Sequence, residues 1–179
     1  DGGTVPASLV IGAKNDGGGV MTLSFQLGDL EIIDSPDAPT VQSVSGSTAD
    51  GTYKAGDVIT INVVFSEAVT VTTTGGTPQL TLETGSTDQN ASYSSGSGTT
   101  TLAFSYTVQA GDTSSDLNYK ATSSLALNGG TIQDAAGNNA TLTLPALDGS
   151  DSLAGNSALV IDGSAPTIAI TDDDADNSL

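Results

Sequence analysis

Acidic residues are the side chains in this sequence whose types and spacing could do chemistry. Carboxylates that converge on one point repel one another unless a cation lies between them. Several oxygen ligands at flexible distances favour Ca²⁺ over Mg²⁺, and the sequence has no His or Cys to hold zinc. The predicted calcium ligands are acidic and amide residues next to the expected strands: Asp34, Asp37, Glu67, Asp134, Asn138, Asp162, Asp172 and Asp174.

Each of these residues also has a plainer interpretation. An Asp or Asn in a turn closes that turn through its own backbone, as an Asx-turn, and needs no metal. Taken singly the residues favour the turn role, whereas Asp37, Glu67 and Asp134 as a group favour an ion. The run 172–177 begins like a D-x-D-x-D-G calcium loop, but Asn177 stands where that loop has Gly. An EF-hand-like loop, a contributor to a junction ion and an ordinary turn stay open for this run.

The charge of the chain restricts its partners. It carries 21 acidic residues against three basic ones, for a formal net charge of −18. Phosphate binding requires Lys or Arg, so no nucleic-acid partner is expected. No run of about 18 apolar residues occurs, so membrane insertion is not expected either. Without His, Cys or Arg, an enzyme is not expected. A carboxylate pair could serve a glycosidase, but the acids follow turns rather than a cleft.

The elements that must position these residues have a two-residue period. In VITINVVFSE, Ile59, Ile61, Val63 and Phe65 share one face, and TLAFSYTV repeats the pattern. Clusters of Gly, Asn, Asp and Ser separate such runs. The periodicity disfavours disorder, the alternative for an acidic chain rich in Gly and Ser. We predict an all-β fold, an antiparallel β-sandwich of about seven strands. The predicted strands cover 41–46, 58–66, 78–84, 90–95, 100–108, an interrupted 117–133, and 141–145 resuming at 157–162.

Loops of such a sandwich fall at its two ends, and the acids divide between them. The end near the incoming linker is expected to hold Asp34, Asp37, Glu67, Asp134 and Asn138. The far end, near the outgoing linker, is expected to hold Asp50, Asp57, Asp112, Asp116 and Asp162. Each end would meet a neighbouring domain, so a calcium ion at each junction would stiffen the linker.

The sequence also echoes itself. IIDSPDAPTVQSV and VIDGSAPTIAI share an apolar residue, Ile, Asp, a short spacer and Ala-Pro-Thr. A repeat of about 125 residues is too long for a solenoid unit and fits tandem domains. Residues 1–36 are therefore predicted to be C-terminal strands of a preceding β domain. Residues 37–166 form one complete sandwich on this prediction, and 167–179 begin the next repeat of a longer chain.

Three stretches occur together and in order: AGDVITI…FSEAV, VQAGDTSSDL and LNGGTIQDAAGN. In them the chain, from about Thr40 to Thr167, resembles the bacterial Ig-like or cadherin-like tandem repeat of large secreted surface proteins. Repeats-in-toxin adhesins and a cyanobacterial swimming protein carry repeats of this type. The resemblance implies an Ig-like sandwich that extends a long chain at the bacterial cell surface or outside the cell, with Ca²⁺ as the stiffening ion. The absence of Cys fits type I secretion.

The expected function is therefore that of a spacer whose partners are adjacent repeats of the same chain. Two alternatives stay open. One is self-association into an extracellular filament or biofilm matrix, for which unpaired strand edges would be suited. The other is binding of a polysaccharide, which usually needs aromatic platforms. The sequence offers few of these: Tyr53, Tyr93, Tyr106, Tyr119 and three Phe.

Overall fold

The chain divides into two compact units, Asp1–Ser35 and Pro36–Leu179. The computed structural model describes residues 13–14, 20–21 and 37–166. In the first unit, strands β1 (Ala13–Lys14) and β2 (Val20–Met21) pair antiparallel. The other residues of the strands predicted before 37, and the strand predicted after 166, lie outside the described residues. No helix within the described ranges has the length and apolarity needed to cross a membrane.

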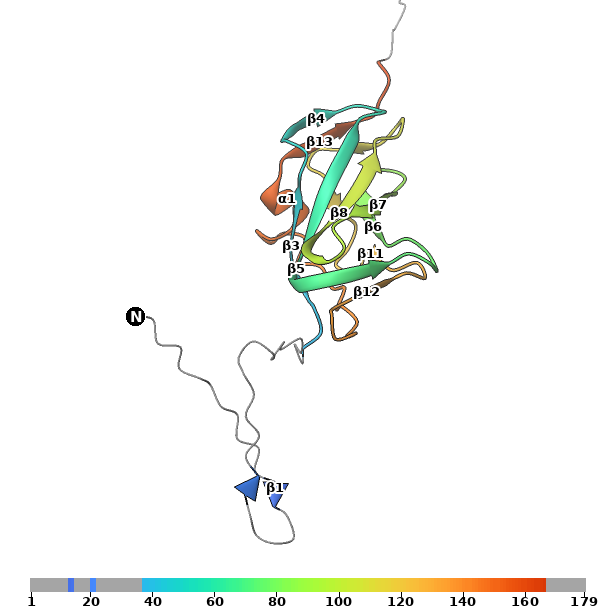
Figure 1. The fold of residues 1–179 in the computed structure, drawn as a ribbon. Coiled ribbons are helices and arrows are strands. Elements are labelled where there is room, and N and C mark those ends of the chain that lie inside the picture. Colours follow the sequence, from blue (N-terminus) through green and yellow to red (C-terminus); the bar gives the residue numbers. More distant parts are fainter. Residues whose placement is uncertain (1–12, 15–19, 22–36, 167–179) are drawn as a thin grey trace, which may run out of the picture. The chain divides into compact units, whose positions relative to one another are not determined.

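The second unit consists of β-strands and a single turn of helix (Figure 1). In chain order they are β3 (Val41–Gly46), β4 (Gly51–Tyr53), β5 (Val58–Thr72), β6 (Gln79–Glu83), β7 (Gln89–Ser95), β8 (Thr99–Thr107), β9 (Thr113–Ser114), β10 (Asn118–Tyr119), β11 (Leu125–Ala126), β12 (Thr131–Gln133), α1 (Leu153–Asn156) and β13 (Leu159–Asp162). The helical turn was not predicted; Ser152 caps it by accepting a hydrogen bond from the Gly155 N–H on its side-chain oxygen.

Two sheets enclose one core. The main sheet has the order β10-β6-β7-β8-β5-β12, with β11 also on β6 and β3 also on β5, and a small sheet has the order β4-β13-β9. All pairs are antiparallel except β13 with β4. The predicted all-β class is therefore confirmed. The count of about seven strands is not, because turns divide the region 117–133 into β10 and β11 on β6 and β12 on β5.

Strand β5 forms the middle of the domain. Its alternation places Ile59, Ile61, Val63 and Phe65 in the core, each at most 2% exposed. Between Val64 and Val69 the register with β8 shifts, because β5 carries extra residues there. Such a bulge bends a strand, and in Figure 1 β5 runs down the domain and then turns aside toward β12. The strand therefore continues to Thr72, beyond its predicted end at 66.

The core is one cluster of aliphatic side chains with a few aromatic ones. The expected large members, Phe65, Phe104 and Tyr106, are each at most 2% exposed, and Tyr119 joins them. Leu153, Leu159 and Ile161 come from the C-terminal part of the unit and close the same cluster. The predicted strand at 141–145 does not form in the sheet: it makes an isolated parallel bridge between Thr40 and Thr141.

The incoming linker is fixed at one end of β5. The Ser66 N–H donates to the Thr40 carbonyl (2.8 Å), and the Thr141 N–H donates to the Pro39 carbonyl (2.7 Å). The Thr40 N–H in turn donates to the side-chain oxygen of Ser66 (3.0 Å). Val41, the first residue of β3, pairs with Phe65. The linker therefore enters where β5 bulges.

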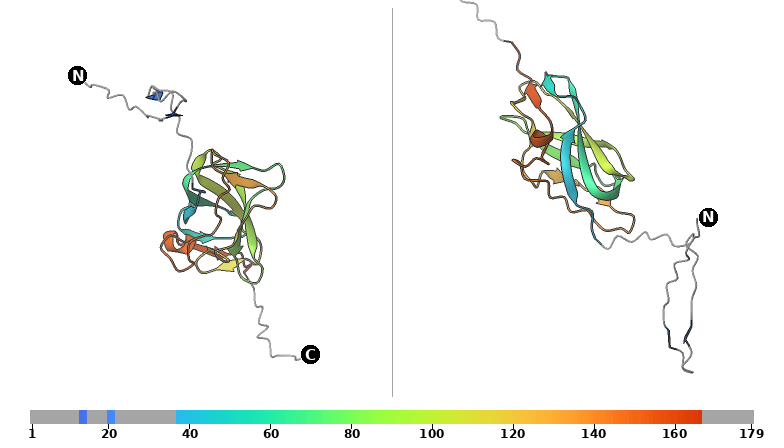
Figure 2. Two further views of the ribbon diagram at one scale, coloured as in Figure 1. Left: turned by 90° about the horizontal axis from the view of Figure 1, so that it is seen from below. Right: turned by 90° about the vertical axis from the view of Figure 1, so that its left-hand side faces the viewer.

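The outgoing linker is fixed at the other end of β5. The Gly163 N–H donates to the Asp112 carbonyl (2.7 Å), and the Gly111 N–H donates to the Gly163 carbonyl (2.9 Å). The loop that holds Gly111 follows β8, whose Thr107 pairs with Val58 at the start of β5. The chain thus enters and leaves the described domain at opposite ends, as Figure 1 and the right-hand view of Figure 2 show.

Candidate functional site

The bulge of β5 and the loop after β12 lie beside the incoming linker. Glu67 follows Ser66, whose backbone and side chain both hydrogen-bond Thr40. The loop that begins at Asp134 returns to the linker where Thr141 bonds Pro39. Three of the predicted ligands, Asp37, Glu67 and Asp134, therefore belong to segments that meet at one end of the domain.

Asp134 and Asn138 close the loop between them on each other. One carboxylate oxygen of Asp134 accepts from the Asn138 N–H and the other from the Asn138 side-chain amide, both at 2.8 Å. The Asp134 N–H donates to the Asn138 carbonyl (3.1 Å). Burial opposes the charge of Asp134, but the hydrogen bonds from Asn138, Gly137 and Ala136 outweigh it and hold the pKa below its ordinary value. This is the turn-closing role that was the alternative to metal binding.

A complete metal site is not formed within the described part of the chain. Among residues 13–14, 20–21 and 37–166, no three acidic side chains come close enough to hold an ion together. Asp34, Asp172 and Asp174 lie outside the described residues. The calcium site therefore stays a prediction, to which the described domain contributes at most part of the ligands.

The outgoing end contains two copies of one turn, which we call the X-A-G-D turns: Lys54–Asp57 and Gln109–Asp112. In each, the third residue is a Gly with a φ of 92°, and a carboxylate oxygen of the Asp accepts the N–H of the first residue, at 2.9 Å and 2.7 Å. The two turns lie side by side, because the Val108 N–H donates to the Asp57 carbonyl and the Gly56 N–H to the Val108 carbonyl, both at 2.9 Å.

Asp112 is the buried member of this pair, at 3% exposure. Besides the Gln109 N–H, it accepts from the Tyr106 hydroxyl (2.6 Å) and from the Gln89 side-chain amide (3.1 Å). Burial raises the pKa of Tyr106, and the hydrogen bond to Asp112 raises it further. The sequence placed Asp112 at the correct end, but its burial depends on Tyr106 and Gln89, which belong to two other strands.

Three other predicted acids of this end, Asp50, Asp57 and Asp162, also hold local backbone. A carboxylate oxygen of Asp50 accepts from the Ala158 N–H (2.9 Å), which ties the turn before β4 to β13. Asp162 accepts from the Ser164 N–H (3.3 Å) in the outgoing linker. The hydrogen bond from the Lys54 N–H lowers the pKa of Asp57. Each of these carboxylates thus has a structural role at its own position.

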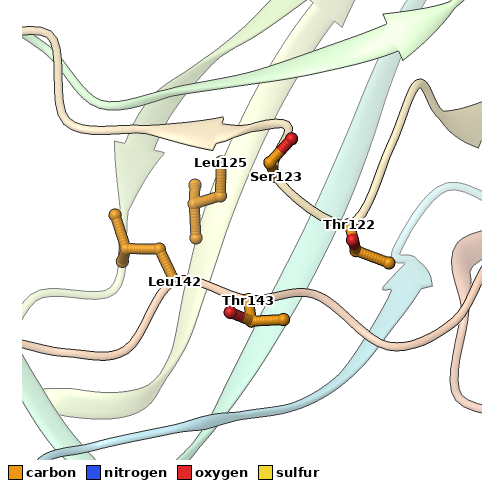
Figure 3. A pocket seen from close by; sticks show the side chains of 5 residues that line it. All are labelled: Thr122, Ser123, Leu125, Leu142 and Thr143. Atoms are coloured by element: carbon orange, nitrogen blue, oxygen red, sulfur yellow. The ribbon is translucent and has the colours of Figure 1, made fainter.

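Two hollows mark the surface of the domain. One, of about 260 Å³, is lined by Thr122, Ser123, Leu125, Leu142 and Thr143, with Leu125 and Leu142 approaching from two chain segments (Figure 3). The other, of about 290 Å³, is lined by the loops after β6 and β8, which include Asp112, and by Gln89 at the start of β7. Neither has an aromatic residue in its lining. Within 37–166 all the aromatic side chains are buried or half-buried.

No protein-family model, curated protein or solved structure matches this chain.

Proposed function

We propose that residues 37–166 are a spacer repeat of a long adhesin at the bacterial cell surface or in the extracellular medium, and that Ca²⁺ stiffens its junctions with adjacent repeats. The observation that supports the spacer role most is the position of the linkers at opposite ends of β5. The segment Val58–Phe65 separates these ends by roughly 23 Å at the usual rise of a strand. Each such repeat would therefore lengthen the chain.

The anchoring of both linkers supports the same role. A spacer transmits direction only if the chain cannot swivel where it enters and leaves. Here the incoming linker accepts two backbone hydrogen bonds and donates one to the Ser66 side chain, and the outgoing linker donates one backbone hydrogen bond and accepts another. The echo between IIDSPDAPT and VIDGSAPT further suggests that each outgoing linker continues as the incoming linker of the next repeat.

The distribution of charge supports calcium at the junctions. The net charge of −18 opposes close approach of two domain ends. If repeats follow one another, Asp162 at the outgoing end of one copy would lie near Asp37, Glu67 and Asp134 of the next. In the repeated linker sequence Asp34 stands where Asp162 does, so the 179-residue chain carries one complete set of these acids. A shared site between copies would supply the ligands that one domain lacks, and Ca²⁺ tolerates such a mixed oxygen set.

The alternatives have less support in the described domain. Strand exchange into a filament needs open sheet edges, but other backbone already bonds to the margin formed by β12 and β3. The Ala140 N–H donates to the Ile132 carbonyl of β12, and the Val44 N–H of β3 donates to the Asp151 carbonyl, both at 2.9 Å. Polysaccharide binding would have to proceed without an exposed aromatic ring within 37–166.

The experiment that tests this proposal is thermal unfolding of the 179-residue chain in millimolar Ca²⁺, in chelator, and in NaCl of matched ionic strength. We expect Ca²⁺ to raise the midpoint beyond the effect of NaCl, because a bound ion stabilises by about 2.7 kcal/mol at a hundred times its Kd. Small-angle scattering in the same buffers would report stiffening as a narrower distribution of distances.

A pair of variants separates a site from screening of charge. Glu67→Gln should reduce the calcium-dependent rise, while Asp148→Asn, which removes one charge from an exposed loop, should leave it unchanged. Equal midpoints in Ca²⁺ and NaCl would contradict the calcium part of the proposal, and the spacer role would then rest on the linker geometry.

A further inference from the structure

Asn128 has an unusual backbone. It is the one residue other than Gly with a positive φ, 50°, in the described part of the chain. The next residue, Gly129, has a φ of 89°, and the Gly130 N–H donates to the Leu127 carbonyl (2.9 Å). This hydrogen bond joins the first and fourth residues of a turn, and the two residues between them both have a positive φ. Such a turn is of type I′, which prefers the pair Asn-Gly.

A second turn, which contains Gly75 and Gly76, lies against the turn at Asn128 and Gly129. A methyl group placed on Gly76 would lie 1.7 Å from the Asn128 carbonyl oxygen, and one on Gly129 would lie 2.5 Å from the Gly75 carbonyl oxygen. The two backbones are therefore in direct contact, at a distance that no side chain would allow. The contact joins the loop between β5 and β6 to the turn between β11 and β12.

The side chain of Asn128 holds the same contact. Its amide nitrogen donates to the Thr77 carbonyl (3.3 Å) and to the Gln79 side-chain oxygen (3.0 Å). Both partners belong to the opposite loop or to the strand that follows it. The Asn128 amide therefore faces two acceptors, which an amide N–H₂ satisfies and a carboxylate would not.

Asn-Gly is the sequence in which deamidation meets the least steric resistance, because Gly leaves the following nitrogen unhindered. Residues 128–129 are the one Asn-Gly pair in this chain. In the reaction the Gly129 nitrogen loses its proton and bonds to the side-chain carbonyl carbon of Asn128. The bond from that carbon to the amide nitrogen breaks, and ammonia leaves. Water then opens the cyclic imide at either carbonyl, giving Asp or isoaspartate.

We propose that Asn128 is a deamidation site that the folded domain protects, and that its conversion opens the contact between the two glycine turns. The turn and the two hydrogen bonds hold the amide away from the geometry of the cyclic imide, so reaction requires local opening. The proposal does not depend on the spacer function.

Either product of the reaction would lower the stability of the domain. Asp at 128 directs a carboxylate at the Thr77 and Gln79 oxygens, so two hydrogen bonds are lost and oxygens face one another unless Gln79 reverses its amide. Isoaspartate adds a methylene to the backbone, so the four-residue turn no longer matches the glycines opposite. A chain that reacts while unfolded would therefore refold into a weaker domain.

The first test incubates the 179-residue chain at mildly alkaline pH, folded in buffer and unfolded in urea, and follows residue 128 by peptide mass spectrometry. We expect conversion to be at least tenfold slower in the folded chain, with a local opening cost of about 1.4 kcal/mol already sufficient for that factor. The other Asn residues serve as internal controls and should react more slowly than Asn128 in urea. Equal rates at Asn128 in both states would overturn the protection.

The second test compares variants. Gln79→Ala removes one acceptor and should raise the rate at Asn128 in the folded chain. Asn128→Asp should lower the unfolding midpoint more than Asn128→Gly, because Gly keeps the positive φ without adding a charge. If Asn128→Asp fails to fold while Asn128→Gly folds, the consequence for the contact is supported; if both match the parent chain, it is overturned.

Discussion

Asp134 and Asp112 lie at opposite ends of the domain and act in the same way. Each carboxylate accepts a backbone N–H from its own loop, four residues ahead for Asp134 and three residues behind for Asp112. Asn and Asp are selected in such loops because their short side chains reach this far and no further. At the scale of single residues, an Asp predicted as a metal ligand, Asp134, therefore closes a turn in the same way as Asp112.

The loss of folding stability at low pH should depend in part on Asp134. Its pKa lies below the ordinary value in the folded chain, so the folded state binds fewer protons. The resulting stability is present above a pH of about 4, the pKa of an unfolded carboxyl, and is lost as the pH falls through the folded pKa. Asp134→Asn should therefore lose less stability on acidification than the parent chain, as measured by urea unfolding at each pH. Asp148→Asn is the control for net charge, and parallel acid limbs for Asp134→Asn and the parent would contradict the assignment.

Gly76 should be the least replaceable glycine of the domain. Gly76→Ala would place a methyl group 1.7 Å from the Asn128 carbonyl oxygen, whereas the Gly98→Ala methyl meets nothing within 4 Å. Both residues have a positive φ, so both variants carry backbone strain of about 1 kcal/mol. We expect Gly76→Ala to cost about 3 kcal/mol more in the free energy of unfolding than Gly98→Ala. Similar losses in chemical denaturation would show that the two glycine turns are not in contact.

At the scale of elements, periodicity was sufficient to predict four strands of the main sheet, β3, β6, β7 and β8. The predicted 41–46 is β3 as observed, and 78–84, 90–95 and 100–108 differ from β6, β7 and β8 by at most one residue at each end. These strands pair on both sides or face the core directly, so the apolar alternation reflects their burial.

The elements at the margin were not predictable in the same way. Leu142 and Leu144 alternate as in a strand, yet the neighbouring N–H of Thr141 bonds to Pro39 and that of Leu144 bonds to Thr122, so the segment joins two different parts of the chain. The bulge in β5 could not be predicted either, because nothing in SEAVT itself shows that β8 pairs with fewer residues there. Local sequence does not encode which distant backbone will supply the partner.

The candidate site, too, could be predicted from the sequence only in part. Alternation of loops predicted which acids share an end of the domain. The direction of each carboxylate was not predictable, because it depends on Asn138 for Asp134 and on Tyr106 and Gln89 for Asp112. Those partners stand in other loops or strands and carry no local signal that would pair them with an Asp.

Tyr106, near the end of β8, should stabilise the turn that contains Asp112. Tyr106→Phe removes the hydroxyl that donates to Asp112 (2.6 Å) and leaves a buried carboxylate with one donor fewer. A hydrogen bond to a charged group contributes about 2 kcal/mol, so the variant should be less stable by that amount in urea unfolding. Tyr93→Phe is the control, because its oxygen accepts from the exposed Ser97 N–H (3.0 Å) and should cost about 0.5 kcal/mol. Equal effects would show that Asp112 does not depend on Tyr106.

At the scale of the whole molecule, the proposed function rests on where the chain enters and leaves residues 37–166. Thr40 is held beside Ser66 at one end of β5, and Gly163 is held beside Asp112 at the other. A domain with both linkers at one end would fold the chain back on itself, whatever ions its acids bind. The proposal of calcium at the junctions adds stiffness to this arrangement but does not create it.

The most direct test of this claim is to measure the distance between spin labels near the two linkers by pulsed electron–electron double resonance. The chain has no Cys, so Gln42→Cys and Ser164→Cys, both at exposed positions, can be labelled as a unique pair. We predict one narrow distance of more than about 20 Å, set by the length of β5 between the two ends, with or without Ca²⁺. A distance well below this value, or a broad distribution that reaches short separations, would contradict the spacer account.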